Sequence, residues 1–133
     1  MKGARARNRA VERDFRPKLI MDDSQVLDGL PEFVFELAQH STDPNVMLEV
    51  FRYVLLERQR QDYKWGVQNH QHFVWNTILG EEIGEVAKAA LHNKFGGEEK
   101  DNIKVELIQV IAVAVAWLEC IERNKPVGVT EQG

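Results

Sequence analysis

The chain contains a single cysteine, Cys120, so no disulfide bond can form within it. Small secreted scaffolds held by disulfides are therefore excluded. Structural zinc sites need a compact set of cysteines and histidines, and the sequence has none. Cys120 lies in an apolar stretch, where we expect it to behave as a small buried hydrophobic residue.

Long hydrophobic runs are also missing. The longest, Val110–Leu118, is about half of the roughly 20 residues that a membrane-spanning helix needs. The first residues are basic, but no apolar segment of the kind found in secretory signals follows them. We therefore expect a cytoplasmic protein that does not enter a membrane.

Charge is spread unevenly over the chain. The net charge is −4, yet residues 1–18 hold seven basic and two acidic side chains, about +5, which leaves about −9 for the rest. Residues 1–20 are predicted to be a basic, partly disordered arm, residues 21–124 an all-α domain, and residues 125–133 a polar tail. Such an arm attracts nucleic acid only weakly. Because the body lacks basic patches with interleaved aromatic residues, a nucleic-acid partner is not expected.

Helical periodicity dominates the body, and no strand is predicted. Helices are expected at residues 30–39, 44–63, 72–91 and 102–123. Asp43 is a suitable N-cap with Pro44 at the first helical position, and Gly96 and Gly97 are suited to ending the third helix. The run Val110–Val115 is rich in β-branched residues, but its helical flanks favour a buried helix. These patterns predict an all-α bundle of four to five helices.

Acidic residues gather in the third predicted helix, at Glu81, Glu82 and Glu85. Residues three and four positions apart share a helix face, and one such stripe contains Trp75, Ile78, Glu82, Glu85, Ala89 and His92. On a solvent face these carboxylates would only repel one another by a few tenths of a kcal/mol. On a face directed into a core they would need a cation. Taken alone, the run also fits a charged surface face with Lys88 as a partner.

The last predicted helix repeats this layout. Its stripe contains Asn102, Glu106, Gln109, Val113 and Ala116. This helix has almost no polar side, so Glu106 and Gln109 are expected to lie inside the fold or to line a cleft. A turn at Gly96 and Gly97 would bring Glu82, Glu85 and Glu106 together, with Gln109 as a neutral oxygen ligand and Glu81 at the edge. Oxygen ligands suit Mg²⁺ or Mn²⁺, whereas the Glu-x-x-His pairs of di-iron bundles are absent.

The two acidic motifs resemble those of a known family. Glu81-Glu82-x-x-Glu85, followed by Glu106-x-x-Gln109, is similar to the EExxE…ExxD motif of the MazG-like, all-α nucleoside triphosphate pyrophosphohydrolases. The run from Lys64-Trp65-Gly66 to Asn69-His70 also looks like small phage and bacterial members. The resemblance covers roughly residues 48–123, and it departs from the family at the last motif position, where Gln109 replaces the usual Asp.

This resemblance implies hydrolysis of a nucleoside triphosphate, in particular a deoxynucleoside triphosphate, to the monophosphate and pyrophosphate, in a house-cleaning role. It implies Mg²⁺, or Mn²⁺ in its place, held by Glu82, Glu85, Glu106 and Gln109, and a proton acceptor such as Glu81. Homo-oligomerisation is also expected from the residues, because so small a bundle lacks the surface to cover so apolar a last helix. The resemblance implies a dimer or tetramer.

The substrate side is less sharply defined. Lys64 and Lys88 are candidates for phosphates, Trp65 for stacking on a base, and Asn69 and His70 for hydrogen bonds to base or sugar. Each of these residues also has a purely structural explanation, as a solvated lysine, a core aromatic or a loop residue. A catalytically weak or silent helical module that binds a nucleotide, or acts as an oligomeric scaffold, is the alternative function, and Gln109 is its best support.

Overall fold

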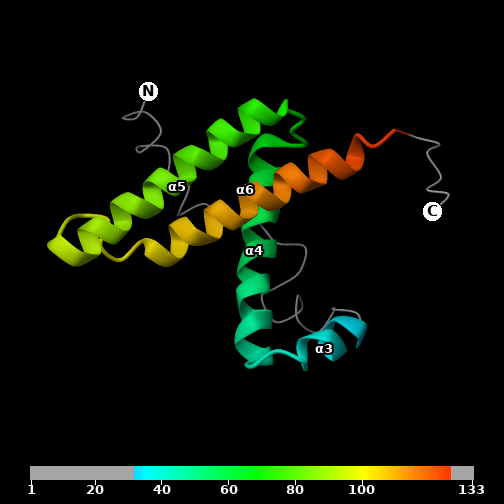
Figure 1. Cartoon of the computed structure of the whole chain (residues 1–133), viewed down its shortest axis with the longest axis horizontal. Helices are drawn as coiled ribbons and strands as arrows, with labels where there is room; N and C mark the ends of the chain where they lie inside the picture. The colour runs from blue at the N-terminus through cyan, green and yellow to red at the C-terminus, as the bar shows by residue number, and fades with distance from the viewer. Residues whose placement is uncertain (1–31, 127–133) are drawn as a thin grey trace. The chain divides into compact units, whose positions relative to one another are not determined.

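The computed structural model describes residues 32–126, and all regular structure in that range is helical. The helices are α3 (Glu32–Ala38), α4 (Pro44–Trp65), α5 (His72–Phe95) and α6 (Ile103–Arg123) (Figure 1). The predicted all-α class is confirmed, including the helix over Val110–Val115. None of the helices in this range is long and apolar enough to cross a membrane.

Glycines and caps set the helix ends. Two helices run further than the periodicity predicts, α4 to Trp65 and α5 to Phe95, because each ends only where a glycine takes a positive φ, at Gly66 (66°) and Gly96 (89°). The predicted N-cap of α4 is confirmed, since the backbone N–H of Val46 donates to Asp43 Oδ1 at 3.2 Å.

The chain forms two units, residues 1–52 and 53–133, and the boundary lies inside α4. The first unit includes α3 and the beginning of α4, where Arg52 Nη2 and Glu49 Oε1 form an ion pair at 2.6 Å. All the predicted site residues lie in the second unit. The predicted arm (residues 1–20), the start of the first predicted helix and most of the predicted tail lie outside the described residues.

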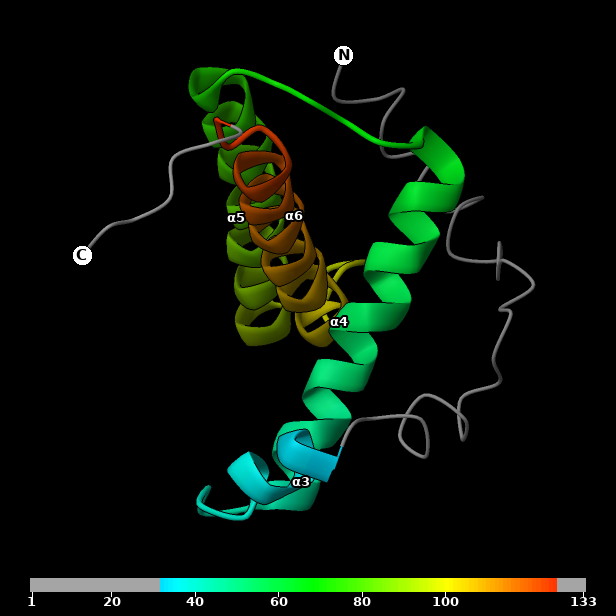
Figure 2. The ribbon, with the colours of Figure 1, turned by 90° about the vertical axis from the view of Figure 1, so that its right-hand side faces the viewer.

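In the second unit, α5 and α6 pack side by side as an antiparallel hairpin (Figures 1 and 2). Trp75 of α5 is buried against Val113, Ala116 and Cys120 of α6. The predicted stripe of α5 is confirmed as its inner face: Trp75, Glu82 and Ala89 are buried, and Ile78, Glu85 and His92 are half-buried. The expected burial of Cys120 is confirmed as well.

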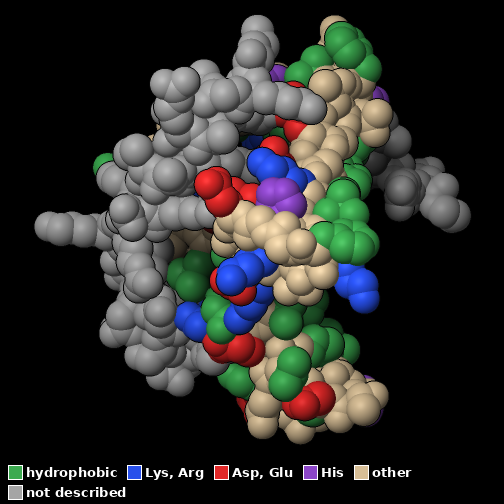
Figure 3. Space-filling model, turned by 90° about the vertical axis from the view of Figure 1, so that its left-hand side faces the viewer, with side chains coloured by type: hydrophobic (Ala, Val, Ile, Leu, Met, Phe, Trp, Pro, Cys, Tyr) green, Lys and Arg blue, Asp and Glu red, His purple; other side chains and the backbone are tan. Residues whose placement is uncertain are grey.

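The outer side of α6 differs from the prediction. The sequence suggested that almost the whole helix is buried, but large hydrophobic side chains are exposed at Leu107, Ile111, Leu118 and Ile121. Hydrophobic side chains also reach the surface, next to charged ones, in the space-filling view (Figure 3). Burial of almost the whole helix thus fails within one chain, because α5 covers one face of α6 and leaves this one open.

The later part of α4 is tied to α6 by charged side chains. Arg58 Nε donates to Glu119 Oε2 at 2.5 Å, and the Lys104 ammonium lies 4.0 Å from the centroid of the Tyr53 ring. Burial acts to lower the pKa of the Arg58 guanidinium, but its hydrogen bonds to Glu119 and Asp62 and the negative charges of both together raise it. These contacts attach α4 to the same unit as the hairpin.

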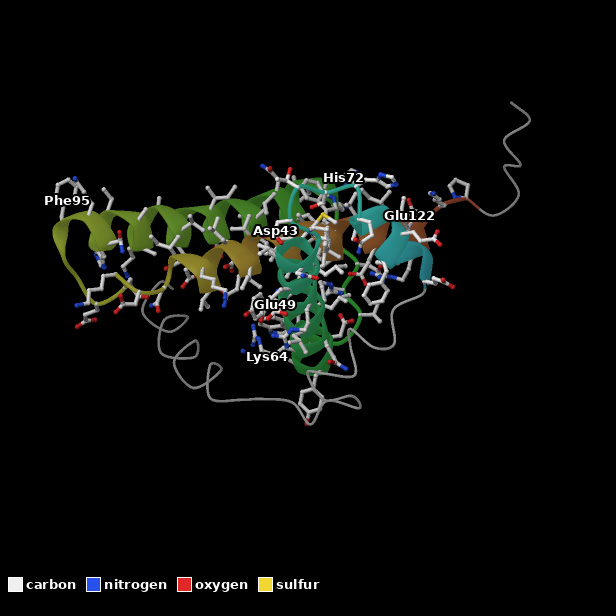
Figure 4. All side chains as sticks on the ribbon, turned by 90° about the horizontal axis from the view of Figure 1, so that it is seen from below. Asp43, Glu49, Lys64, His72, Phe95 and Glu122 are labelled. Atoms are coloured by element: carbon white, nitrogen blue, oxygen red, sulfur yellow. The ribbon has the colours of Figure 1, made fainter. Side chains whose placement is uncertain are left out.

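The turn between α5 and α6 is built around His92. Phe95 lies at the turn end of the hairpin, and His72 and Glu122 lie at the other end (Figure 4). The backbone N–H of Glu99 donates to His92 Nδ1 at 3.2 Å, and the imidazole packs directly against Gly97. A Cβ atom at Gly97 would lie 2.4 Å from His92 Cγ, and the φ of this glycine is 151°. Only glycine therefore fits this position.

The turn gives a prediction of opposite effects for two glycines. Gly97→Ala should destabilise the protein by about 1–3 kcal/mol, because it combines a strained backbone with a clash on His92. Gly84→Ala should stabilise it by about 0.4–1 kcal/mol, since Gly84 is helical and a Cβ there meets open space. Urea unfolding followed by circular dichroism measures both; equal midpoints for Gly97→Ala and wild type would refute this account of the turn.

Candidate functional site

Two carboxylates are buried where α5 faces α6. Glu82 of α5 is 6% exposed, and Glu106 of α6 is 1% exposed and is the largest fully buried side chain among the described residues. An ionised carboxylate taken out of water costs several kcal/mol unless donors or cations surround it. The buried position predicted for Glu106 is confirmed.

The side chain of Gln109 joins these two carboxylates. One end of its amide lies 3.1 Å from Glu82 Oε2 and 3.2 Å from Glu106 Oε2. With the amide nitrogen at this end, Gln109 donates a hydrogen bond to each carboxylate. We call these three residues the Glu82–Gln109–Glu106 cluster. It is the part of the predicted constellation that the fold assembles.

The same amide has a second orientation with almost the same shape. A half-turn about its last bond places the amide oxygen against the two carboxylate oxygens, so that three oxygens face one another. This arrangement is unfavourable by itself and becomes favourable around a cation. The donor set, two carboxylates and one amide oxygen, is of the hard oxygen type that Mg²⁺ and Mn²⁺ prefer. With the amide oxygen turned inward, the cluster offers three oxygen ligands of the type that suits a divalent cation. With the amide nitrogen turned inward, Gln109 hydrogen-bonds both carboxylates.

Glu85 and Glu81 are less buried than Glu82 and Glu106. Glu85 is half-buried one turn after Glu82, and Glu81 is exposed, in agreement with its predicted place at the edge. Within residues 32–126, no three His, Cys, Asp or Glu side chains are grouped closely enough to hold a metal ion. The structure thus brings together two carboxylates, Glu82 and Glu106, and the Gln109 amide. The role of Glu85 as a third carboxylate ligand stays a prediction.

The later part of α4 adds polar residues that are not among the candidates predicted from the sequence. Arg60 donates to Glu57 through both Nε (2.8 Å, to Oε2) and Nη2 (2.6 Å, to Oε1). Both side chains are mostly buried, and Gln61, also buried, donates to Glu57. The signal for this set was present, because positions 57, 60 and 61 share one helix face.

The charge of Arg60 also interacts with that of Glu82. Its hydrogen bonds to Glu57 raise the pKa of the guanidinium, burial acts against them, and the negative charges of Glu57 and Glu82 raise it further. Arg60 therefore stays positively charged and within electrostatic reach of Glu82. It supplies part of the compensation that the burial of Glu82 requires.

The candidates for substrate contacts at the end of α4 lie together. The Lys64 ammonium is 4.7 Å from the centroid of the Trp65 ring, and the guanidinium carbon of Arg60 is 5.9 Å from it. Trp65 is exposed, as is Lys64. Lys88 is exposed on α5. An exposed aromatic ring with two cations around it is a surface that can hold an aromatic anion.

Asn69 and His70 instead hold the loop between α4 and α5. Asn69 Oδ1 accepts hydrogen bonds from Asn124 Nδ2 at 3.0 Å and from Arg123 Nη2 at 3.3 Å, at the end of α6. The His70 ring packs edge-on against Trp75, with centroids 4.9 Å apart. These contacts of Asn69 and His70 fit their role as loop residues.

No protein-family model, curated protein or solved structure matches this chain. The resemblance to MazG-like enzymes therefore remains a hypothesis that rests on the motif residues.

The cluster predicts a stability cost for losing its amide. Gln109→Met keeps a similar shape but removes the donor between two buried carboxylates, so it should destabilise the metal-free protein by about 1–3 kcal/mol. Gln59→Met, at an exposed position of α4, should stay within about 0.5 kcal/mol of wild type. Denaturant unfolding in EDTA compares the two; similar values for both would show that the amide does not support the carboxylates.

Proposed function

We propose that this protein is a Mg²⁺-dependent nucleoside triphosphate pyrophosphohydrolase of the MazG-like type. The observation that carries the proposal is the Gln109 amide, 3.1 and 3.2 Å from two buried carboxylates on different helices. Carboxylates at such depth are expensive unless they serve a charged ligand. The cation and aromatic group of Arg60, Lys64 and Trp65 supports an anionic, aromatic substrate such as a nucleotide.

In this proposal Glu82 and Glu106 supply the negative charge that holds the ion, and Gln109 turns its oxygen toward it. Glu85, half-buried one turn after Glu82, would be the third carboxylate ligand. When bound, Mg²⁺ supplies positive charge for the phosphate oxygens and makes a nearby water more acidic. Glu81, exposed at the edge, accepts a proton from the attacking water. The water oxygen bonds to the α-phosphorus, the bond to the bridging oxygen breaks, and pyrophosphate leaves with the nucleoside monophosphate as the other product.

The direct test is a panel of ribo- and deoxyribonucleoside triphosphates with Mg²⁺, Mn²⁺ or EDTA, scored for pyrophosphate against orthophosphate. Metal-dependent release of pyrophosphate, without orthophosphate, is the expected result. If no nucleotide yields pyrophosphate, the enzyme proposal fails. The second candidate, a silent nucleotide-binding or scaffold module, would then be favoured by the amide orientation that ties Glu82 to Glu106 without any metal.

Loss of a carboxylate from the cluster should abolish most of the activity. Glu82→Gln and Glu106→Gln are each expected to lower kcat at least about 100-fold, since a group that stabilises charge in the transition state is lost. Glu122→Gln changes an exposed acid near the end of α6 and should keep wild-type turnover. Steady-state pyrophosphate release measures all three; full activity in both cluster variants would place the active site elsewhere.

We also propose that the protein is a homodimer or homotetramer that uses the outer side of α6. Leu107, Ile111, Ala114, Leu118 and Ile121 recur there at spacings of four and three residues, the repeat that lets two helices interlock. The side chains at Leu107 and Leu118 are exposed, and no charged residue occurs between them. A continuous exposed apolar stripe of this kind supports contact with another apolar surface.

This surface yields a prediction about mass in solution. Leu118→Glu should convert the oligomer into single chains of 15.3 kDa, because a carboxylate would be buried in the interface. Leu91→Glu is the matched control, since Leu91 of α5 is 58% exposed and Leu118 is 61% exposed. Light scattering after size exclusion gives the masses. A monomeric wild type, or equal dissociation by both variants, would contradict the proposed interface.

A further inference from the structure

We propose that Arg60 binds the phosphates of the substrate, between the buried carboxylates and the Trp65 ring. This assignment rests on the proposed function, and it adds a residue that the motif does not include. It also gives the nucleotide a direction on the protein. The phosphates point toward Glu82 and the base toward Trp65.

The position of Arg60 carries the inference. Its guanidinium carbon is 5.9 Å from the centroid of the exposed Trp65 ring, and its charge interacts with that of Glu82. Arg60 thus lies near the aromatic candidate for base stacking and interacts electrostatically with one carboxylate of the cluster.

The way Arg60 is held suits a phosphate. Glu57 fixes the guanidinium plane through two hydrogen bonds, at 2.8 and 2.6 Å, so little side-chain freedom remains to be lost when a ligand arrives. A guanidinium has five N–H donors, in a planar arrangement that matches phosphate oxygens. One group can therefore hold a carboxylate and a phosphate at the same time.

The charges around the cluster give a second argument. A triphosphate brought next to Glu82 and Glu106 meets like charges, and a cation must offset this repulsion. Lys64, one helical turn after Arg60, is exposed, so water and salt screen its charge. The Arg60 side chain is only 16% exposed, so its attraction is screened less. Arg60 is therefore the stronger of the two phosphate candidates, and Lys64 extends the same positive surface.

A purely structural Arg60, a counter-ion for Glu57 and Glu82, would behave differently from a phosphate ligand. The distinguishing probe is inorganic tripolyphosphate, which has the phosphates of the substrate and no base. Arg60→Met should weaken binding of tripolyphosphate and of a nucleoside triphosphate by the same factor, about tenfold or more, as loss of a charged hydrogen bond does. Trp65→Ala should weaken the nucleotide and leave tripolyphosphate unchanged.

The experiment is calorimetric titration of the full chain with each probe, together with KM for the nucleotide. Arg60→Lys, which keeps the charge without the planar pair of donors, should fall between wild type and Arg60→Met. Arg58→Met is the control: it breaks the bridge to Glu119 on α6, so it should lower stability and keep both affinities. Circular dichroism checks that each variant is folded.

Wild-type affinity of Arg60→Met or, if that variant does not fold, of Arg60→Lys for tripolyphosphate would overturn the assignment. Equal effects of Arg60→Met and Arg58→Met would overturn it as well, since a structural role explains them. Both results leave the proposed function intact. Conversely, tripolyphosphate binding that needs Arg60 in a protein releasing no pyrophosphate would support the phosphate site and refute the hydrolase.

Discussion

The burial of two carboxylates between α5 and α6 is the constraint on which the rest of the second unit depends. Glu82 and Glu106 face each other because the hairpin turn at Gly97 brings the two stripes into contact, and their negative charges oppose that contact. The Gln109 amide relieves this repulsion locally, and Arg60 adds a positive charge from a third helix. A hydrophobic pair at these positions would be simpler to pack, and the charged ligand of the proposed function would account for the two carboxylates.

The later part of α4 has two roles that follow from its helical geometry. Arg58 and Arg60 lie two residues apart and therefore point to different sides of the helix. Arg58 reaches Glu119 and fastens α4 to α6, while Arg60 pairs with Glu57 and acts on Glu82. The two arginines thus have separate partners, and the contact of Arg58 with α6 is distinct from the electrostatic effect of Arg60 on Glu82.

Periodicity predicted what depends on one helix at a time. The inner stripes of α5 and α6, the burial of Glu106 and the N-cap at Asp43 all follow from spacing and residue type. What depends on neighbours was not predictable. The outer side of α6 is apolar but open, because the sequence does not say how many faces find a partner. The pairing of Glu57 with Arg60 lies within one helix, and nothing in its spacing shows that Arg60 interacts with Glu82 of α5.

The neutral Gln109 can be compared with a carboxylate at the same position. A third carboxylate between Glu82 and Glu106 would bind a cation more strongly, but without one it would put three like charges in a place shielded from water. Without a metal ion, the amide can donate hydrogen bonds to the carboxylates; with an ion bound, its oxygen can face the ion. It would therefore reduce the free-energy difference between the metal-free and the metal-bound cluster. Metal binding would then be weaker and more readily reversible than with an aspartate. In the proposed function, Gln109 would therefore be compatible with an ion that arrives together with the substrate, because the phosphates would supply the missing negative ligand.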